Sequence, residues 1–162
     1  MEFDHVFLAP VLVSAGGMTR HKLRLPDEVA EPLRAAGVRR LVGTVDGAPF
    51  RLAMHRSREG FSFLALSRAR VAELGLESGA IVAVEVSADP EPDRVDLGAE
   101  LAAALDGAPD ARAVWDGLTP GTRRALAYHV TSAKRTGTRQ GRATDLVRRL
   151  RDGTHQALRR RW

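Results

Sequence analysis

The chain contains no cysteine. This absence excludes disulfide bonds, thiolate metal sites and a cysteine nucleophile together. The apolar runs are also shorter than the roughly 18 residues that a membrane-spanning helix needs. The apolar patch near the start follows Glu2 and Asp4, whereas a secretory signal peptide begins with positive charge. We therefore expect a cytoplasmic protein with no signal peptide and no membrane span.

Recognisable catalytic motifs are missing as well. The histidines do not occur in the HxH or HExxH spacing that marks a metal site. The chain also lacks the G-x-S-x-G elbow that presents a nucleophilic serine. Catalytic groups can be assembled from distant parts of a chain, so an enzyme remains a minor hypothesis. The sequence predicts no metal and no cofactor, and it favours a non-enzymatic protein.

The basic residues are strongly concentrated at one end of the chain. Residues 119–162 contain 12 basic and 2 acidic residues, whereas residues 1–118 contain 13 basic and 18 acidic ones. A basic segment of this kind attracts polyanions such as nucleic acid, an acidic protein surface or an anionic membrane. The alternatives are a solvated helix face, or a surface that docks on the acidic first part of the chain.

The first half of the chain reads as a β-rich domain. Asp46-Gly47 separates two strand-like segments and is typical of a type I′ hairpin, in which both central residues need positive φ. A short or kinked helix is expected to open at Pro26, as its first helical residue, and another to follow Ser67, which is a candidate N-cap. The segment 80–87 is apolar on both faces except at Glu85, which predicts a strand buried on both sides. The strand-like segments are 3–13, 20–25, 38–45, 48–55, 61–66 and 80–87.

The second half reads as a helical domain, because the apolar period changes from 2 to 3.6 after the proline-rich stretch 89–93. We place the boundary between residues 92 and 93. A first helix is expected to be capped by Asp96 and a second to open at Pro109. The third runs from Thr119-Pro120 to about Arg135, and the fourth from about Gln140 to Asp152.

Four motifs, taken in order, resemble the YdeI/OmpD-associated family, also called bacteriocin-protection proteins. The resemblance implies an α+β protein, with an N-terminal double-split β-barrel followed by a C-terminal helical module, and a role in stress or bacteriocin protection. Small barrels of this shape are usually dimers that bind DNA, which is an analogy of fold. The motifs are Leu25-Pro26 with Val29-Ala30, residues 42–51 (VGTVDGAPFR), residues 74–84 (LGLESGAIVAV), and Ala133-Lys134-Arg135 with Thr138-Arg139.

The chain departs from the family pattern at several positions. Ala80 stands where the family has an acid after the turn glycine, and Gly137 stands where it has an acid before Thr-Arg. Gln140-Gly141-Arg142 replaces the family's Arg-Arg-Ile. The C-terminal signature is therefore incomplete, and the resemblance supports the fold more strongly than any activity.

One glycine-containing stretch, residues 136–142, is a candidate anion-binding site. It joins the third and fourth expected helices, so free backbone N–H groups at the start of the fourth helix would lie beside basic side chains. Helix N-termini and guanidinium groups both favour anions, although a plain surface loop is the alternative. The candidate residues are Lys134, Arg135, Thr138, Arg139 and Arg142.

These observations favour a non-enzymatic binding protein with a basic helical surface that contacts nucleic acid or another polyanion. Contact is expected to be dominated by phosphates, because aromatic residues are scarce and Trp115 and Tyr128 are expected in the helical core. The alternative is a barrel that sequesters a small molecule or peptide in an apolar pocket lined by 61–66 and 80–87. A protein–protein interaction module is a further hypothesis. Self-association as a homodimer is expected, because open strand edges need cover.

Overall fold

The structure, a computed structural model, describes residues 2–13 and 21–158. The chain divides into two compact units, Met1–Pro92 and Asp93–Trp162. Each unit has its own core of buried apolar residues. Across the described ranges, no helix combines the length and the apolar character needed to cross a membrane.

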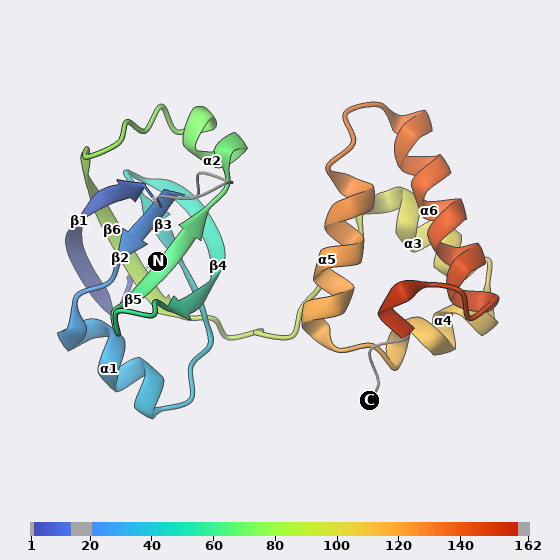
Figure 1. Ribbon diagram of the computed structural model, residues 1–162, viewed down its shortest axis with the longest axis horizontal. Helices are drawn as coiled ribbons and strands as arrows, with labels where there is room; N and C mark the ends of the chain where they lie inside the picture. The colour runs from blue at the N-terminus through green and yellow to red at the C-terminus, as the bar shows by residue number, and fades with distance from the viewer. Residues whose placement is uncertain (1, 14–20, 159–162) are drawn as a thin grey trace. The chain divides into compact units, whose positions relative to one another are not determined.

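The first unit is a closed, six-stranded antiparallel β-barrel (Figure 1). Its strands neighbour one another in the order β1-β2-β5-β4-β3-β6. Every pairing around the ring is antiparallel. This confirms the expected barrel, which precedes a helical unit. The strands are β1 (His5–Val13), β2 (His21–Arg24), β3 (Arg40–Val45), β4 (Ala48–Arg56), β5 (Ser62–Leu66) and β6 (Ile81–Ala88).

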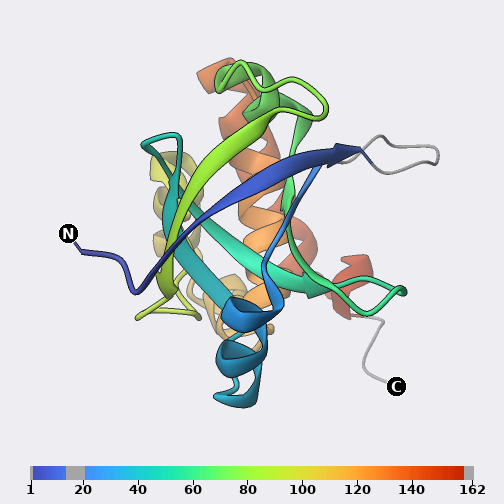
Figure 2. The same cartoon turned by 90° about the vertical axis from the view of Figure 1, so that its left-hand side faces the viewer.

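Two long strands close the barrel by changing partners along their length. β1 pairs with β6 through residues 5–10 and then with β2 through residues 11–13. β4 pairs with β3 through residues 48–53 and then with β5 through residues 54–56. Each of these strands has nine residues, so each is long enough to belong to two sheets. Figure 2 shows β1 crossing beside β6 at this closure.

Local sequence signals set the connections of the barrel as expected. Asp46 has φ 47° and Gly47 has φ 80°, as a type I′ hairpin requires. The helix α1 (Asp27–Ala35) begins directly after Pro26, which is its N-cap rather than its first helical residue. The helix α2 (Arg68–Glu73) is capped by the Ser67 hydroxyl, which accepts a hydrogen bond from the Arg70 backbone N–H.

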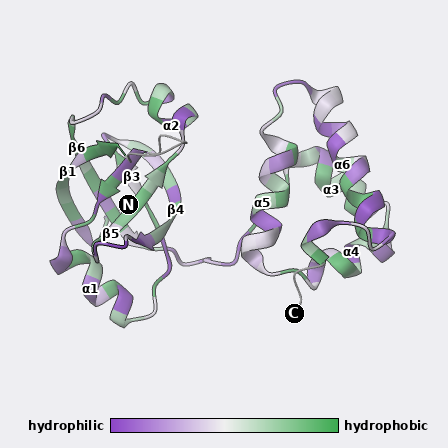
Figure 3. Cartoon of the chain, in the orientation of Figure 1, coloured by the Kyte–Doolittle hydropathy of each residue, from purple (hydrophilic) through white to green (hydrophobic). Residues whose placement is uncertain are grey.

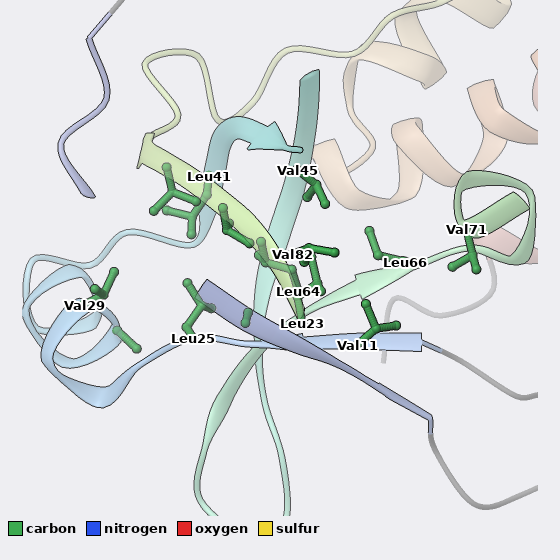
Figure 4. Packing of buried hydrophobic residues seen from close by; sticks show 14 residues of the cluster. Val11, Leu23, Leu25, Val29, Leu41, Val45, Leu64, Leu66, Val71 and Val82 are labelled. Carbon is green, nitrogen blue, oxygen red and sulfur yellow. The ribbon is translucent and has the colours of Figure 1, made fainter. Parts of the chain in front are cut away.

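The interior of the barrel is filled by side chains from all six strands. Leu23, Leu41 and Leu64 are buried there (Figure 4), and Val84 is buried as well. Segments 61–66 and 80–87, which were expected to line a ligand pocket, instead contribute packed core residues. The prediction that β6 is buried on both faces is wrong, because Ile81 on its outer face is 62% exposed. A single barrel has one interior, so alternate residues of β6 must face outward.

Closure of the barrel also removes the basis of one expectation. In the described part of the sheet every strand has a neighbour on each side. Full closure is the arrangement that leaves no unpaired strand edge. Self-association through an open edge is therefore not supported by this sheet.

Over its described residues, 93–158, the second unit is a bundle of four helices and a short 3₁₀ turn. The turn, η1, spans Gln156–Leu158. Trp115, Val130 and Leu150 lie in the core of the helical unit. Figure 3 shows how hydrophobic and hydrophilic residues alternate along the helices. Thr119 caps its helix through the Thr122 backbone N–H, as expected. The helices are α3 (Gly98–Asp106), α4 (Pro109–Asp116), α5 (Pro120–Thr131) and α6 (Thr136–Arg151).

Two expectations about this unit are wrong. Asp96 does not cap α3: Leu97 occupies the N-cap position, and the Asp96 carboxylate accepts a hydrogen bond from Arg94 instead. Tyr128 does not lie in the core, because its side chain on α5 is turned outward and the residue is 64% exposed. Trp115, in contrast, is 2% exposed, as expected.

Candidate functional site

The helical unit separates its charges between its two halves. Residues 93–118, which include α3 and α4, contain six acidic and two basic residues, whereas residues 119–162 contain two acidic and 12 basic ones. α5 and α6 run in opposite directions in Figure 1 and contact each other along the bundle. The basic residues between 123 and 151 therefore lie on one pair of neighbouring helices and the turn that joins them.

The turn between α5 and α6 lies about four residues earlier in the chain than the sequence suggested. α5 ends at Thr131 and α6 begins at Thr136, so the turn spans residues 132–135, and residues 136–139 form the first turn of α6. The expected end of α5 near Arg135 and the expected start of α6 near Gln140 are both wrong. Residues 136–138 are threonine and glycine, which are poor helix formers, so the sequence did not indicate that α6 begins there. Tertiary contacts of Arg139 stabilise this part of α6 in spite of that preference.

Arg139 directs its side chain into the turn. Its Nε donates to the Glu100 carboxylate of α3 at 2.7 Å. Its other donors reach the backbone oxygens of Ala133 and Lys134 at 3.2 and 3.1 Å, and the Thr136 hydroxyl at 2.9 Å. The hydrogen bond from Arg139 lowers the pKa of Glu100 below its ordinary value of 4.5. Arg139 therefore joins α3, the turn and α6.

Arg142 also supports the turn from below. Its Nη1 donates to the backbone oxygen of His129 at 2.7 Å, near the C-terminal end of α5. The last carbonyl groups of a helix have no partner within the helix, and a cation near them is stabilising. Arg142 therefore links the C-terminal end of α5 to α6 through its Nη1 group.

Lys134 and Arg135 are positioned differently. Both are exposed, and in the described part of the chain their side chains form no hydrogen bond and no ion pair. Arg135 occupies the N-cap of α6 without a side-chain cap, and no acidic residue lies in the first turn. The N–H groups of a first helical turn lack partners within the helix. Thr138 is exposed in that same turn.

The structure thus divides the five candidate residues into two sets. Lys134, Arg135 and Thr138 lie on the exposed side of the α5–α6 turn, which we call the α6 entry. Arg139 and Arg142 lie beneath it and hold it in place. The sequence could not separate these roles, because all five residues are polar and closely spaced. The separation depends on Glu100, which is 39 positions from Arg139.

The arginines at the other end of α6 are neutralised in part. Arg148 and Arg149 pair with Asp145 at 2.6 and 2.8 Å. Arg148 and Arg151 also approach Asp152, at 3.7 and 3.6 Å. The hydrogen bond from Arg148 lowers the pKa of Asp145 below its ordinary value of 3.8. The C-terminal end of α6 is therefore less available to an external anion than the α6 entry.

Each unit matches a different family model. The helical unit matches a family model described as "Bacteriocin-protection, YdeI or OmpD-Associated" over residues 94–153. The barrel matches the model of a domain of unknown function (DUF1905) over residues 7–86. The helical unit is therefore similar to the YdeI/OmpD-associated family, and the barrel to the domain of unknown function. No curated protein and no solved structure matches it.

The match of the helical unit covers the whole candidate site. The α6 entry and the residues beneath it lie inside the range matched by the YdeI/OmpD-associated model. Tyr128, the exposed aromatic residue of α5 that was expected in the core, lies in the same range. The position of Tyr128 one turn after Arg124 on a basic helix was the available signal, since residues four apart share a helix face.

Proposed function

We propose that this protein is a bacteriocin-protection family member, and a non-enzymatic binding protein whose helical domain, residues 93–162, contacts nucleic acid through phosphate groups. The barrel, residues 1–92, serves as the scaffold. The observation that supports this proposal is the α6 entry, where Lys134 and Arg135 are exposed and unpaired in the described structure beside an uncapped helix N-terminus.

The physical argument combines three attractions for an anion at one place. Free N–H groups and the positive end of the helix dipole point out of the first turn of α6. Arg135 can offer two parallel donors to a phosphate, and Lys134 adds a mobile point charge. Because neither side chain has to give up a partner within the described structure, binding a phosphate there breaks no existing ion pair.

Single-stranded nucleic acid is the form that the surface favours. Tyr128 is exposed on α5, and a base that is free of a duplex can stack on such a ring. Side chains suited to reading base edges are scarce, since Gln140 is the one amide residue of α6. We therefore expect contact that tolerates many sequences and depends strongly on salt.

Replacing Lys134 and Arg135 together with alanine is expected to reduce the salt dependence of binding. Each phosphate contact contributes about 0.7 to the slope of log K against log salt for a single strand, so loss of two contacts lowers the slope by roughly 1.4. Fluorescence anisotropy with a labelled random single strand, at several salt concentrations, measures this slope.

The matched control removes two positive charges from the barrel. Arg58 and Arg68 are exposed, and the R58A/R68A variant has the same net charge as K134A/R135A. An unchanged slope in the control supports contact at the α6 entry. An equal decrease in the salt slope in both variants would show that binding depends only on net charge. Wild-type protein that binds no single strand at low salt would contradict the proposal.

The alternative function, sequestration of a small molecule or peptide inside the barrel, has less support. The inward positions of 61–66 and 80–87 pack against other core residues. A ligand in that place would have to displace Leu64, Val82 or Val84, which are at most 2% exposed. Displacing buried side chains of this size costs roughly 1.5–3 kcal/mol each.

We also propose that the barrel associates with a second copy of itself through an outer apolar strip. Val6 and Leu8 of β1 are 68% and 70% exposed, and Ile81 of β6 is 62% exposed. Leu8 pairs with Ala83, and Pro10 with Ile81, so the strip continues across both strands. Exposed apolar patches mark interaction surfaces, and a twofold pair is the commonest assembly of identical chains.

Replacing Leu8 with lysine is expected to shift the protein to a monomer. Two apposed lysines would bring like charges into an apolar interface, which costs several kcal/mol. Sedimentation velocity over a range of concentrations measures the assembly, with Val13→Lys as the control, because Val13 lies at the far end of β1 and is also exposed. A wild-type monomer at all concentrations would contradict this proposal.

A further inference from the structure

A basic hollow lies on the outside of the barrel, separate from its packed interior. Its volume is about 380 Å³, which falls within the range of small-molecule sites. The loop after α1 forms one wall and the end of β4 forms the other. The lining residues are Arg34, Gly37, Val38, Arg39, Met54, His55 and Arg56.

Positive charge in this hollow exceeds negative charge. Glu31 is the acidic residue that pairs with the lining, at 3.8 Å from Arg34 and 3.7 Å from Arg56. Both distances are too long for a hydrogen bond. One carboxylate therefore approaches two of the three guanidinium groups of the hollow, and Arg39 is the third arginine of the lining.

The donors of these arginines are not all satisfied. The Nη1 of Arg34 is buried and has no hydrogen-bond acceptor in the described structure. The side chain of Arg39 is exposed and forms no hydrogen bond or ion pair with the described residues. A buried donor without an acceptor costs about 1–3 kcal/mol. An anion in the hollow would supply acceptors to the exposed side chain of Arg39.

The remaining wall suits a flat, partly apolar group. His55 is exposed, and its ring stacks on Phe63 with centroids 5.5 Å apart and an angle of 29° between the planes. Lys22 Nζ lies 4.6 Å from the centroid of Phe63. Val38 and Met54 contribute apolar surface beside His55. An aromatic ring bound here would extend the stack that His55 and Phe63 begin.

We infer that the hollow binds a mononucleotide. The phosphate would accept hydrogen bonds from Arg34, Arg39 and Arg56, and the base would pack against His55. Guanidinium groups bind phosphate through pairs of parallel donors, and bases stack on histidine and other aromatic side chains. This site is independent of the α6 entry, because the two lie in different domains.

The test uses the full chain and isothermal titration calorimetry with AMP, adenosine and inorganic phosphate. Adenosine lacks the phosphate, and inorganic phosphate lacks the base. We expect AMP to bind more tightly than either. Replacing Arg39 with alanine is expected to weaken AMP binding by roughly 10- to 100-fold, the effect of losing a charged hydrogen bond. Arg39 is exposed and uses only its backbone within the barrel, so folding is not at risk.

Three further variants assign the site. His55→Ala is expected to weaken AMP binding about tenfold through loss of stacking, and to leave the binding of inorganic phosphate unchanged. Arg68→Ala removes an equal charge elsewhere in the barrel and is expected to have no effect. K134A/R135A is also expected to have no effect, which separates this site from the α6 entry. AMP that binds no more tightly than inorganic phosphate, or equal losses in the Arg39 and Arg68 variants, would overturn the inference.

Discussion

Replacing Gly43 with alanine is expected to unfold the barrel domain or leave it barely stable. Gly43 lies in β3, opposite Phe50 of β4 and Val86 of β6. A Cβ atom at this position would lie 1.9 Å from the backbone oxygen of Glu85 and 3.0 Å from the Phe50 ring. The oxygen belongs to the neighbouring strand and cannot swing aside as a side chain does. We expect a loss of roughly 3–5 kcal/mol, at the upper end of single-substitution effects.

The control for this variant is the next residue of the same strand. Thr44 points outward, and its hydroxyl donates to Glu85 at 2.6 Å. Thr44→Ala removes that hydrogen bond without a clash and is expected to cost about 1 kcal/mol. Hydrogen exchange of barrel amides measures both losses, while Trp115 fluorescence reports on the helical domain. Equal protection in the two variants would show that β3 and β6 can separate without cost.

Replacing Asp89 with asparagine is expected to cost the barrel about 3 kcal/mol at pH 7, because it removes one partner of a buried ion cluster. The Asp89 side chain has no exposed surface and lies between Arg51 and Arg40. Arg51 Nε donates to one carboxylate oxygen at 2.7 Å, and Arg51 Nη2 donates to the other. An asparagine amide would present an N–H group to Arg51, so a partly buried guanidinium would lose its nearest charged acceptor.

The effect should depend on pH in a defined direction. The hydrogen bond from Arg51 lowers the pKa of Asp89 below its ordinary value of 3.8. A carboxyl group with a lowered pKa in the folded state contributes stability above the unfolded pKa and loses it as pH falls through the folded pKa. The wild type is therefore expected to have a larger free energy of unfolding than Asp89→Asn at pH 7. This difference in stability is expected to shrink as the pH falls below about 4.

Chemical denaturation of both proteins at pH 7 and at pH 3 measures this difference. The control is Asp27→Asn, because Asp27 is exposed and its contact with Arg24 is 4.0 Å long. Exposed pairs of this kind contribute roughly 0–1 kcal/mol. A difference between wild type and Asp89→Asn that stays constant from pH 7 to pH 3 would contradict a charged role for Asp89.

Local signals predicted the parts of the fold that depend on a few neighbouring residues. The Asp46-Gly47 turn and the Ser67 cap could be read from sequence because their chemistry lies within four residues. The outer face of β6 could not, since its apolar residues look the same whether they pack inward or remain exposed. Only the position of β6 in the closed ring shows that Ile81 faces outward.

The candidate site shows the same limit at the level of side chains. The sequence located the basic segment around Lys134 and Arg142, but it could not show which cations were already engaged. Arg139 is occupied by Glu100, a residue of another helix. The arginines of the basic hollow are spread over residues 34–56. The barrel brings them together, and no spacing along the chain marks them as a group.

The pairing of β1 with β6 also sets the order of events when the protein is made. His5 pairs with Val86, so the barrel closes between its first and last strands. Contacts so distant in sequence form slowly, and a chain emerging from the ribosome cannot complete this ring until residue 86 is free. Until then, residues 5–10 of β1 lack β6, the strand with which they pair. The helical domain, built from neighbouring helices, has no such delay and can fold as soon as it is released.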